Sequence, residues 1–263
     1  MARVICIGNG KGGVAKSTTV VNLAYELTKK GKKVLVLDFD AQADTTKFLT
    51  SLATQDQDYF IGDVLLDRKF DIRKAIYPAV IANDVIDNLF IIKGRAGDAM
   101  TKLVMDMNSV PKREERLKLH LQNIMDEFDF VIIDTAPNPN VLMMNAVMAA
   151  SEFIIPTEFA EHSLDGIETI LTHICEVAFV EEDEIDFMVL PTKIARGSTK
   201  SLRKGNAYCG ERFPDNMAQT YIWHRTIFAE AESVHKPMSM YKSSDVAAMW
   251  YKNFAKEVIE NVI

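Results

Sequence analysis

The sequence predicts a doubly wound α/β fold, in which helices cover both faces of a mostly parallel sheet. Apolar runs of strand length alternate along the chain with longer helix-like segments. Two of these runs, Val34 to Leu37 and Val131 to Ile133, are each followed by an aspartate. Buried parallel strands have this composition, and ligands of such folds bind beyond the carboxyl ends of the strands. Sequential β and α units of this kind imply right-handed crossovers.

The elements follow one another in a simple order. The first strand is expected at residues 3–7 and the first helix at 17–30, on either side of a glycine-rich loop. The other strands are expected at 33–38, 89–93, 130–134, 152–156 and 186–191, and the other helices at 112–127, 140–150, 163–179 and 244–261. The elements of residues 52–127 are placed only by their order along the chain.

Length and composition predict one domain over residues 1–263. No Pro-, Gly- or Ser-rich linker divides the chain, and 48% of its residues are hydrophobic, which is enough for a large core. The start MARVICIG is expected to be a strand and not a signal peptide, and no apolar run is long enough to span a bilayer. The three cysteines show no paired metal spacing and are expected to be free thiols. These features predict a cytoplasmic protein.

The glycine-rich loop GNGKGGVAKSTT, Gly8 to Thr19, predicts a phosphate-binding loop and therefore the P-loop NTPase version of the fold. In the pattern G-x-x-x-x-G-K-[ST], Gly10 is the first glycine, Lys16 and Ser17 end the motif, and Ala15 replaces the last glycine. Backbone N–H groups of such a loop turn toward phosphate oxygens at the start of a helix, whose dipole favours an anion.

Each residue type of the loop has an expected task. Lys16 is expected against the outer phosphates, and the Ser17 hydroxyl is expected to bind Mg²⁺. The residues predicted to contact the nucleotide are Gly10, Lys11, Gly12, Gly13, Val14, Ala15, Lys16, Ser17 and Thr18. Thr192 and Lys193, which follow a predicted strand, are candidates for the base pocket by position alone. A simple glycine-rich turn between a strand and a helix is the alternative.

The loop resembles the deviant Walker A motif, K-G-G-x-x-K-[ST], of the ParA and MinD family of ATPases. VLVLDFDAQADTT, Val34 to Thr46, is similar to the second motif of that family, and FDFVIIDTAPN, Phe128 to Asn138, is similar to its Walker B strand. The resemblance covers roughly residues 1–50 and 128–263. It implies ATP and Mg²⁺ as cofactors and a homodimer in the ATP state.

The resemblance also implies roles for single residues. Lys11, the extra lysine, reaches the phosphates bound by the other subunit of the dimer. Asp40 orients the attacking water, and the predicted catalytic residues are therefore Lys11, Lys16 and Asp40. The predicted metal-site residues are Ser17, Asp40 and Asp134. The alternative for Asp38, Asp40 and Asp134 is that they cap the next helix or close a turn.

Charge placement leaves the DNA question open. The formal net charge of −7 argues against bulk attraction to nucleic acid, yet a basic strip follows an acidic one in the chain. The basic strip consists of Lys193, Arg196, Lys200, Arg203, Lys204 and Arg212. ParA-like ATPases bind DNA nonspecifically as ATP-bound dimers and work with a ParB-like centromere-binding protein, so the resemblance favours a DNA surface and nucleoid association. An ordinary solvated helix surface is the alternative.

Several other functions compete with DNA partition. Within the family, MinD-like membrane binding is the main rival, but the last helix lacks a Lys/Arg-rich polar face and is expected to pack on the protein. Arg225 is the only arginine where relatives have an I-P-R-N-x-R run, which makes DNA contacts there doubtful. A Cβ at Ala15 could weaken ATP binding if the backbone needs a positive φ, which keeps a passive ATP-binding assembly module open. A metabolic ligase or reductase is a third possibility, whereas an iron protein of the nitrogenase kind lacks its cysteine ligands here.

Overall fold

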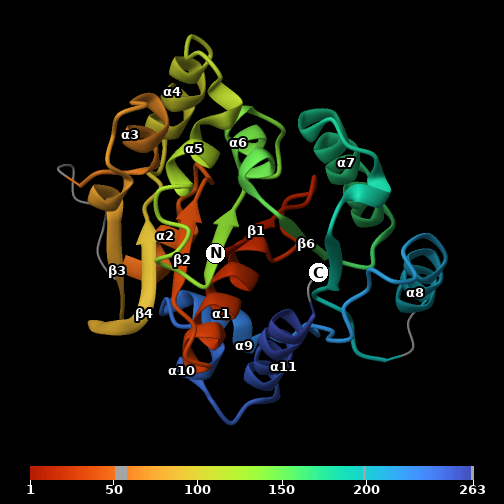
Figure 1. Cartoon of the computed structure of the whole chain (residues 1–263). Coiled ribbons are helices and arrows are strands. Elements are labelled where there is room, and N and C mark those ends of the chain that lie inside the picture. Colours follow the sequence, from red (N-terminus) through yellow and green to blue (C-terminus); the bar gives the residue numbers. More distant parts are fainter. Residues whose placement is uncertain (51–57, 198–199, 262–263) are drawn as a thin grey trace.

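A computed structural model describes residues 1–50, 58–197 and 200–261, which form one seven-stranded sheet flanked by helices (Figure 1). The strand order is β3-β4-β2-β5-β1-β6-β7. Every neighbouring pair is parallel except β3 and β4, which are antiparallel. The predicted doubly wound fold is confirmed. The single domain predicted over 1–263 stays a prediction.

All six expected strands are present in the sheet, although β4 begins five residues earlier than expected. They are β1 (Arg3–Ile7), β2 (Val34–Asp38), β4 (Asp84–Ile92), β5 (Phe130–Asp134), β6 (Glu152–Thr157) and β7 (Phe187–Pro191). Ile7 of β1 and Asp38 of β2 both pair with Asp134 of β5, so the three strands end at the same edge. This register brings the loops after β1, β2 and β5 together, as expected for the ligand-binding edge of such a sheet.

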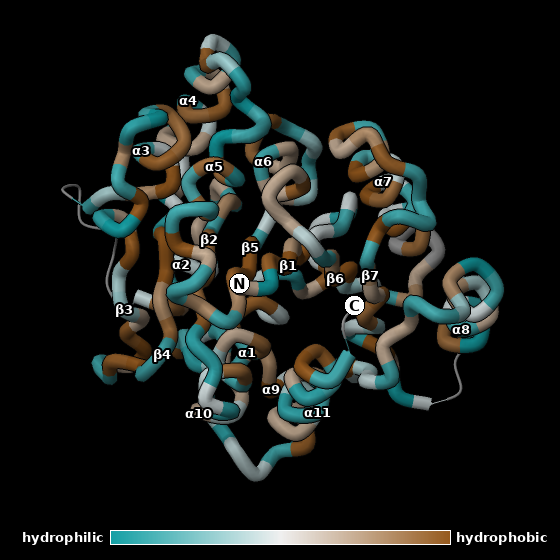
Figure 2. The backbone as a smooth tube through the Cα atoms, in the orientation of Figure 1, coloured by the Kyte–Doolittle hydropathy of each residue, from teal (hydrophilic) through white to brown (hydrophobic). Residues whose placement is uncertain are grey.

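Alternation along the strands divides the core between the two faces of the sheet. Ile5 and Ile7 face one apolar layer, whereas Val4 and Cys6 face the other. The first layer is covered by α1 (Lys16–Lys29), α2 (Asp44–Thr50) and α11 (Val246–Glu260). The second is covered by α3 (Ile61–Leu66), α4 (Asp98–Met107), α5 (Arg116–Leu121), α6 (Val141–Ala149), α7 (Glu161–Ala178) and α8 (Lys200–Arg212). Figure 2 shows that the strands are mostly apolar, whereas most of the helices carry both apolar and polar segments.

The expected packing role of the last helix is confirmed. Tyr251, Phe254 and Val258 of α11 are buried in the core, and the Thr19 and Tyr251 hydroxyls lie 3.3 Å apart. Two short helices, α9 (Ile227–Ser233) and α10 (Met238–Tyr241), pack beside it. Among the described residues, no helix is both long enough and apolar enough to cross a membrane.

The structure contains helices that the sequence did not lead us to expect, namely α2, α3, α4, α8, α9 and α10. Other differences fall within residues 52–127, of which 52–57 lie outside the described residues. β3 (Ile76–Ile81) was not expected, because its Pro78 suits only an edge strand and its side chains are partly exposed. The helix expected at 112–127 is shorter. It consists of the 3₁₀ turn η2 (Arg113–Glu115), α5 and a series of turns. The Asn145 side chain bonds Leu117 N and Arg113 O and fixes this junction to α6.

Two further 3₁₀ turns join the elements. They are η1 (Ile72–Ala75), directly before β3, and η3 (Glu182–Glu184), before β7.

Candidate nucleotide site

The glycine-rich loop between β1 and α1 has a geometry suited to holding an anion. Gly13 and Ala15 both have positive φ, 78° and 66°, which turns the chain back on itself before the helix begins at Lys16. Within the described residues, the backbone N–H groups from Gly12 to Thr18 have no hydrogen-bond partner. Unsatisfied donors at a helix start bind anions readily, so this loop can hold a phosphate chain.

Ala15 adopts the conformation that glycine adopts at little cost. A left-handed backbone costs a residue with a Cβ about 1–2 kcal/mol. The sequence predicts that Ala15 could disturb the loop if its backbone needs a positive φ. The structure shows that it does, since Ala15 has φ 66°. The loop is formed all the same, since neighbouring elements hold it in place.

Three contacts fix the loop to the sheet. The buried Asn9 side chain accepts a hydrogen bond from Lys11 N at 2.8 Å and donates to Pro156 O and Thr157 Oγ1 at the end of β6. The Thr192 hydroxyl, after β7, donates to Val14 O at 2.9 Å. Sequence reasoning did not single out Asn9, although its place between a strand and the first loop glycine was a usable signal.

Gly166 of α7 allows the close approach of that helix to the loop. A Cβ on Gly166 would lie 2.2 Å from Asn9 Oδ1, and Gly10 N donates to Gly166 O at 3.4 Å. No side chain fits between α7 and Asn9.

The two loop lysines differ in position. Lys16 is 7% exposed, and its ammonium group donates to Lys11 O at 3.0 Å across the loop. Burial lowers the pKa of Lys16, while Asp134 and Asp40 act in the opposite direction. Lys11 is half-buried and does not line the cavity of its own chain.

Asp134 has a vacant acceptor oxygen at the end of β5. Its Oδ2 accepts from the Thr45 hydroxyl at 2.6 Å, whereas its fully buried Oδ1 has no partner. Burial, followed by repulsion from Asp38, raises the pKa of Asp134 to about 7, and the Thr45 and Ser17 hydroxyls partly offset this rise. A carboxylate oxygen of this kind beside a hydroxyl suits Mg²⁺, which binds few protein ligands and keeps phosphate oxygens and water.

The part of the chain that the structure describes contains no group of three or more His, Cys, Asp or Glu side chains that could hold a metal ion. The Asp134 carboxylate and the neighbouring Ser17 hydroxyl are oxygen groups at the loop that could hold Mg²⁺ together with phosphate oxygens.

Asp38 and Asp40 have different surroundings. Asp38 is buried, and its Oδ2 accepts from both the backbone N and the hydroxyl of Thr46, while Oδ1 accepts from Asp40 N. Burial raises the pKa of Asp38 to about 6. These contacts agree with the alternative that Asp38 caps the next helix, which is α2. Asp40 accepts from Gln42 N but also lines the cavity with Lys16 and Ser17, where it can act on a ligand.

A cavity of about 650 Å³ opens beside the loop, a size that suits a nucleotide. Of the predicted residues, it is lined by Gly12, Gly13, Ala15, Lys16, Ser17, Thr18, Asp40 and Lys193. Gly10, Lys11, Val14, Asp134 and Thr192 lie around it without lining it. The far wall is built from Ile222, Trp223, His224, Arg225 and Phe228. These residues belong to a late segment whose resemblance to the family implies nucleotide contacts, although none of them was among the residues predicted individually to contact the nucleotide.

The candidates for the base pocket mainly support the loop. Thr192 is buried and bonded to Val14 O, and Lys193 Nζ donates to Gly13 O at 2.6 Å. Arg225 pairs with Asp245, the N-cap of α11, at 2.7 Å. Arg225 also lines the nucleotide cavity.

The basic strip is less uniform than its sequence suggests. Arg212 pairs with Glu182 at 2.6 Å and with Glu168 at 3.1 Å, so its charge is already compensated. Arg212 therefore belongs to a mixed-charge cluster and not to a continuous basic strip. Arg196, Lys200 and Lys204 are exposed.

Comparisons with known proteins agree with this geometry. The family model described as an AAA domain matches residues 2–187. The sporulation initiation inhibitor protein Soj of Bacillus subtilis is 29% identical over 269 residues, which cover 99% of this chain and 100% of Soj. The chromosome-partitioning ATPase Soj of Treponema pallidum is 27% identical over 259 residues, covering 98% of each chain.

A solved structure shows similar architecture with ligands bound. The crystal structure of cobyrinic acid a,c-diamide synthase from Mycobacterium smegmatis, with bound ATP analog and magnesium, is 25% identical and has a TM-score of 0.77. The match covers 98% of this chain and 95% of that chain. The ligands of that structure correspond to the ATP and Mg²⁺ predicted here from the sequence.

The family match spans most of the chain, and both the loop with two lysines and the parallel sheet agree with it. The chain therefore belongs to the family described as the AAA domain and is a ParA-like ATPase of the ParA and MinD group.

Proposed function

We propose that this chain is a partition ATPase that binds ATP and Mg²⁺, dimerises around the nucleotide and binds DNA nonspecifically in that state. The observation that carries the proposal is the loop itself. It presents unpaired N–H donors and the Lys16 ammonium group near Asp134, whose Oδ1 has no hydrogen-bond partner, while the second lysine, Lys11, lies outside the cavity. The Soj relatives support a role in partition.

Lys16 is the residue whose hydrogen bond would change when a nucleotide binds. Its ammonium group is held by a loop carbonyl, Lys11 O. A phosphate chain in the cradle offers it a charged acceptor, which forms a stronger hydrogen bond than a neutral carbonyl does. Lys16 would therefore move from the carbonyl to the phosphates and release Lys11 O.

Lys11 acts on the partner subunit in this proposal. Its backbone N–H is fixed by Asn9, and its side chain does not line the cavity of its own chain. A lysine held at the mouth of one site and outside it is placed to complete the site of a second copy. Dimerisation and ATP binding would then be coupled.

Asp40 would orient the attacking water, because it lines the cavity at the phosphate end. Mg²⁺, held by Ser17 and Asp134, supplies charge neutralisation on the phosphates. Phosphoryl transfer depends on positioning and charge more than on covalent help, so a site that lacks pieces turns over slowly. A ParB-like partner would speed this step and release the dimer from DNA. The protein would then be cytoplasmic and associated with the nucleoid.

The decisive experiment is a DNA-binding titration with ATP, ADP or no nucleotide at two salt concentrations. Binding that requires ATP, weakens steeply with salt and ignores sequence is expected. Lys11→Gln should abolish both ATP-dependent dimerisation and DNA binding, while Lys30→Gln, an exposed control on the far end of α1, should change neither. Normal dimerisation of Lys11→Gln contradicts the trans role, and normal hydrolysis by Asp40→Ala contradicts the water assignment.

One alternative function has a specific observation in its favour. The positive φ of Ala15 strains the loop, which favours a passive module that binds ATP without turnover. Phosphate release measured with ATP, DNA and partner together separates the two proposals, since the passive module releases none. MinD-like membrane binding through α11 has less support, because the apolar residues of that helix are buried in the core.

A further inference from the structure

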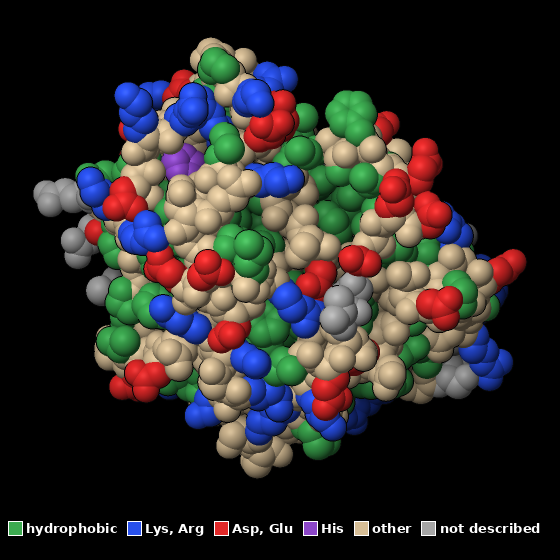
Figure 3. All heavy atoms as spheres, viewed as in Figure 1, with side chains coloured by type: hydrophobic (Ala, Val, Ile, Leu, Met, Phe, Trp, Pro, Cys, Tyr) green, Lys and Arg blue, Asp and Glu red, His purple; other side chains and the backbone are tan. Residues whose placement is uncertain are grey.

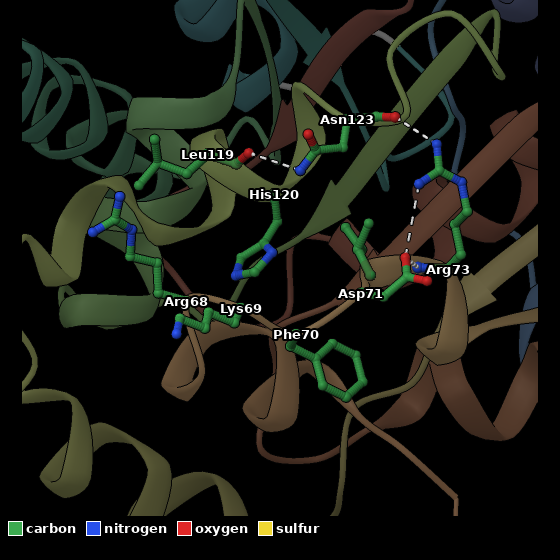
Figure 4. A pocket seen from close by; sticks show the side chains of 9 residues that line it. Arg68, Lys69, Phe70, Asp71, Arg73, Leu119, His120 and Asn123 are labelled. Atoms are coloured by element: carbon green, nitrogen blue, oxygen red, sulfur yellow. Dashed lines mark hydrogen bonds and ion pairs between the residues drawn. The ribbon is translucent and has the colours of Figure 1, made fainter.

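A second cavity lies away from the nucleotide site, between the turn after α3 and the end of α5. It has a volume of about 560 Å³ and shares no lining residue with the nucleotide cavity. Figure 4 shows its wall, in which the His120 imidazole points from α5 toward Lys69 and Phe70. Lys and Arg side chains gather over this α3–α5 corner on the face shown in Figure 3. A cavity of this size suits a small molecule.

The positively charged side chains around this cavity differ in whether acidic side chains pair with them. Arg73 is fully engaged, because it pairs with Glu127 and with Asp71 and donates to Asn123 O. Arg68 and Lys69 are exposed, and neither side chain has a hydrogen-bond or ion-pair partner among the described residues. The rim of the cavity therefore carries two positive charges without a protein counter-charge.

A third positive charge is buried behind the wall. Arg116 is 8% exposed, and its Nε and Nη1 atoms are buried without any hydrogen-bond partner. It lies one turn before His120 on α5, and its charge is close enough to help burial lower the pKa of the imidazole. An unpaired buried guanidinium is destabilising unless something compensates it.

We propose that this cavity binds the oxyanion group, phosphate or carboxylate, of a small anionic molecule. Arg68 and Lys69 would contact the anion directly, and Arg116 would favour it through its charge. Guanidinium groups bind both phosphate and carboxylate with paired hydrogen bonds, so the two sources share one chemistry. The proposal is independent of ATP binding, because the two cavities have no residue in common.

The test uses the full chain labelled with ¹⁵N in its histidine rings and followed by NMR. Inorganic phosphate and succinate are titrated separately. His120 lines the proposed cavity and reports on it, whereas His224 lines the nucleotide cavity and reports phosphate bound at the loop. A saturable shift of the His120 ring resonances is expected with at least one probe. A response to phosphate alone identifies a phosphorylated ligand, and a response to succinate alone identifies a carboxylate.

Two matched double variants decide between a site and general charge attraction. Arg68→Ala with Lys69→Ala should weaken the binding seen at His120 at least tenfold. Lys29→Ala with Lys30→Ala removes the same charge from an exposed helix end and should change it less than twofold. Arg116→Met, which replaces the buried cation with an apolar chain, should also weaken binding. The proposal is overturned if neither probe shifts His120 saturably, or if both double variants weaken binding equally.

Lys16→Ala separates this proposal from the proposed ATPase function. Removing the phosphate-loop lysine should lower the response of His224 to phosphate and leave that of His120 unchanged. If the two responses fall together, the cavity is not an independent site.

Discussion

Replacing Gly166 with alanine tests whether the contact between α7 and the phosphate loop holds the nucleotide site in shape. The new Cβ would lie 2.2 Å from Asn9 Oδ1 and 3.2 Å from Asn9 Cγ, so the Asn9 side chain must move. Asn9 is fully buried and makes three hydrogen bonds, to Lys11 N, Pro156 O and Thr157 Oγ1. Its displacement therefore disturbs the start of the loop.

The expected loss follows from those bonds. Each contributes about 1 kcal/mol, whereas alanine gains roughly 1 kcal/mol over glycine inside a helix, which leaves a net loss of about 2 kcal/mol. For a chain of this size, that loss lowers Tm by roughly 4–8 °C. ATP affinity should fall about tenfold, because the N–H groups beside Lys11 lose their fixed position.

Urea unfolding followed by circular dichroism measures the stability, and titration with a fluorescent ATP analogue measures the affinity. Gly210→Ala is the matched control, since Gly210 lies in α8 and a Cβ there meets nothing within 4 Å. This control should be as stable as the parent or slightly more stable, with unchanged affinity. If Gly166→Ala behaves like Gly210→Ala in both assays, the packing of α7 on Asn9 is not what holds the loop.

Three further predictions concern the same site. Ala15→Gly should remove the left-handed strain and raise stability by up to about 1 kcal/mol in urea unfolding, with tighter ATP binding; a loss of stability contradicts the strain assignment. Asp134→Asn should stabilise the nucleotide-free protein by a few kcal/mol at pH 8, because it removes a buried charge beside Asp38, and should abolish Mg²⁺-dependent hydrolysis. Burial raises the pKa of Asp38 to about 6 and of Asp134 to about 7, above the unfolded value of 3.8, so the folded state binds more protons. Stability from these two groups is therefore present below about pH 4 and lost as pH rises through 6 and 7; urea unfolding across this range should show it, and Asp134→Asn should flatten it.

Local patterns explain why much of the fold could be predicted from the sequence. β1, β2 and β5 are continuous apolar runs, because both of their faces are buried, and such runs are recognisable without any partner strand. The loop after β1 has its motif in consecutive residues. Edge strand β3 carries Pro78 and lies half in solvent, so its sequence resembles a loop, and its pairing with β4 exists only in the sheet.

In the candidate site, too, some residues could be predicted from the sequence and others could not. Lys16, Ser17 and Asp134 were predictable because each lies at a fixed offset from a strand end. The residues whose hydrogen bonds hold the loop in place were not predictable. Asn9 reaches across to β6, 147 residues away, and Thr192 reaches Val14 from 178 residues away. Arg212 was assigned to the basic strip from its position in the chain, but its partners Glu168 and Glu182 come from other elements.

The fold class, the phosphate-loop motif and the aspartates at the strand ends could be read from the sequence, since these features depend on residue type and on spacing within one strand–loop–helix unit. The tertiary structure alone decided that Ala15 carries a positive φ, that Asp38 holds α2 while Asp134 keeps a vacant oxygen, and that Gly166 admits α7 to the loop. The cavity beside His120 also appears only in the folded chain. The physical reason is that burial and hydrogen bonding depend on which distant segments meet, and no single segment contains that information.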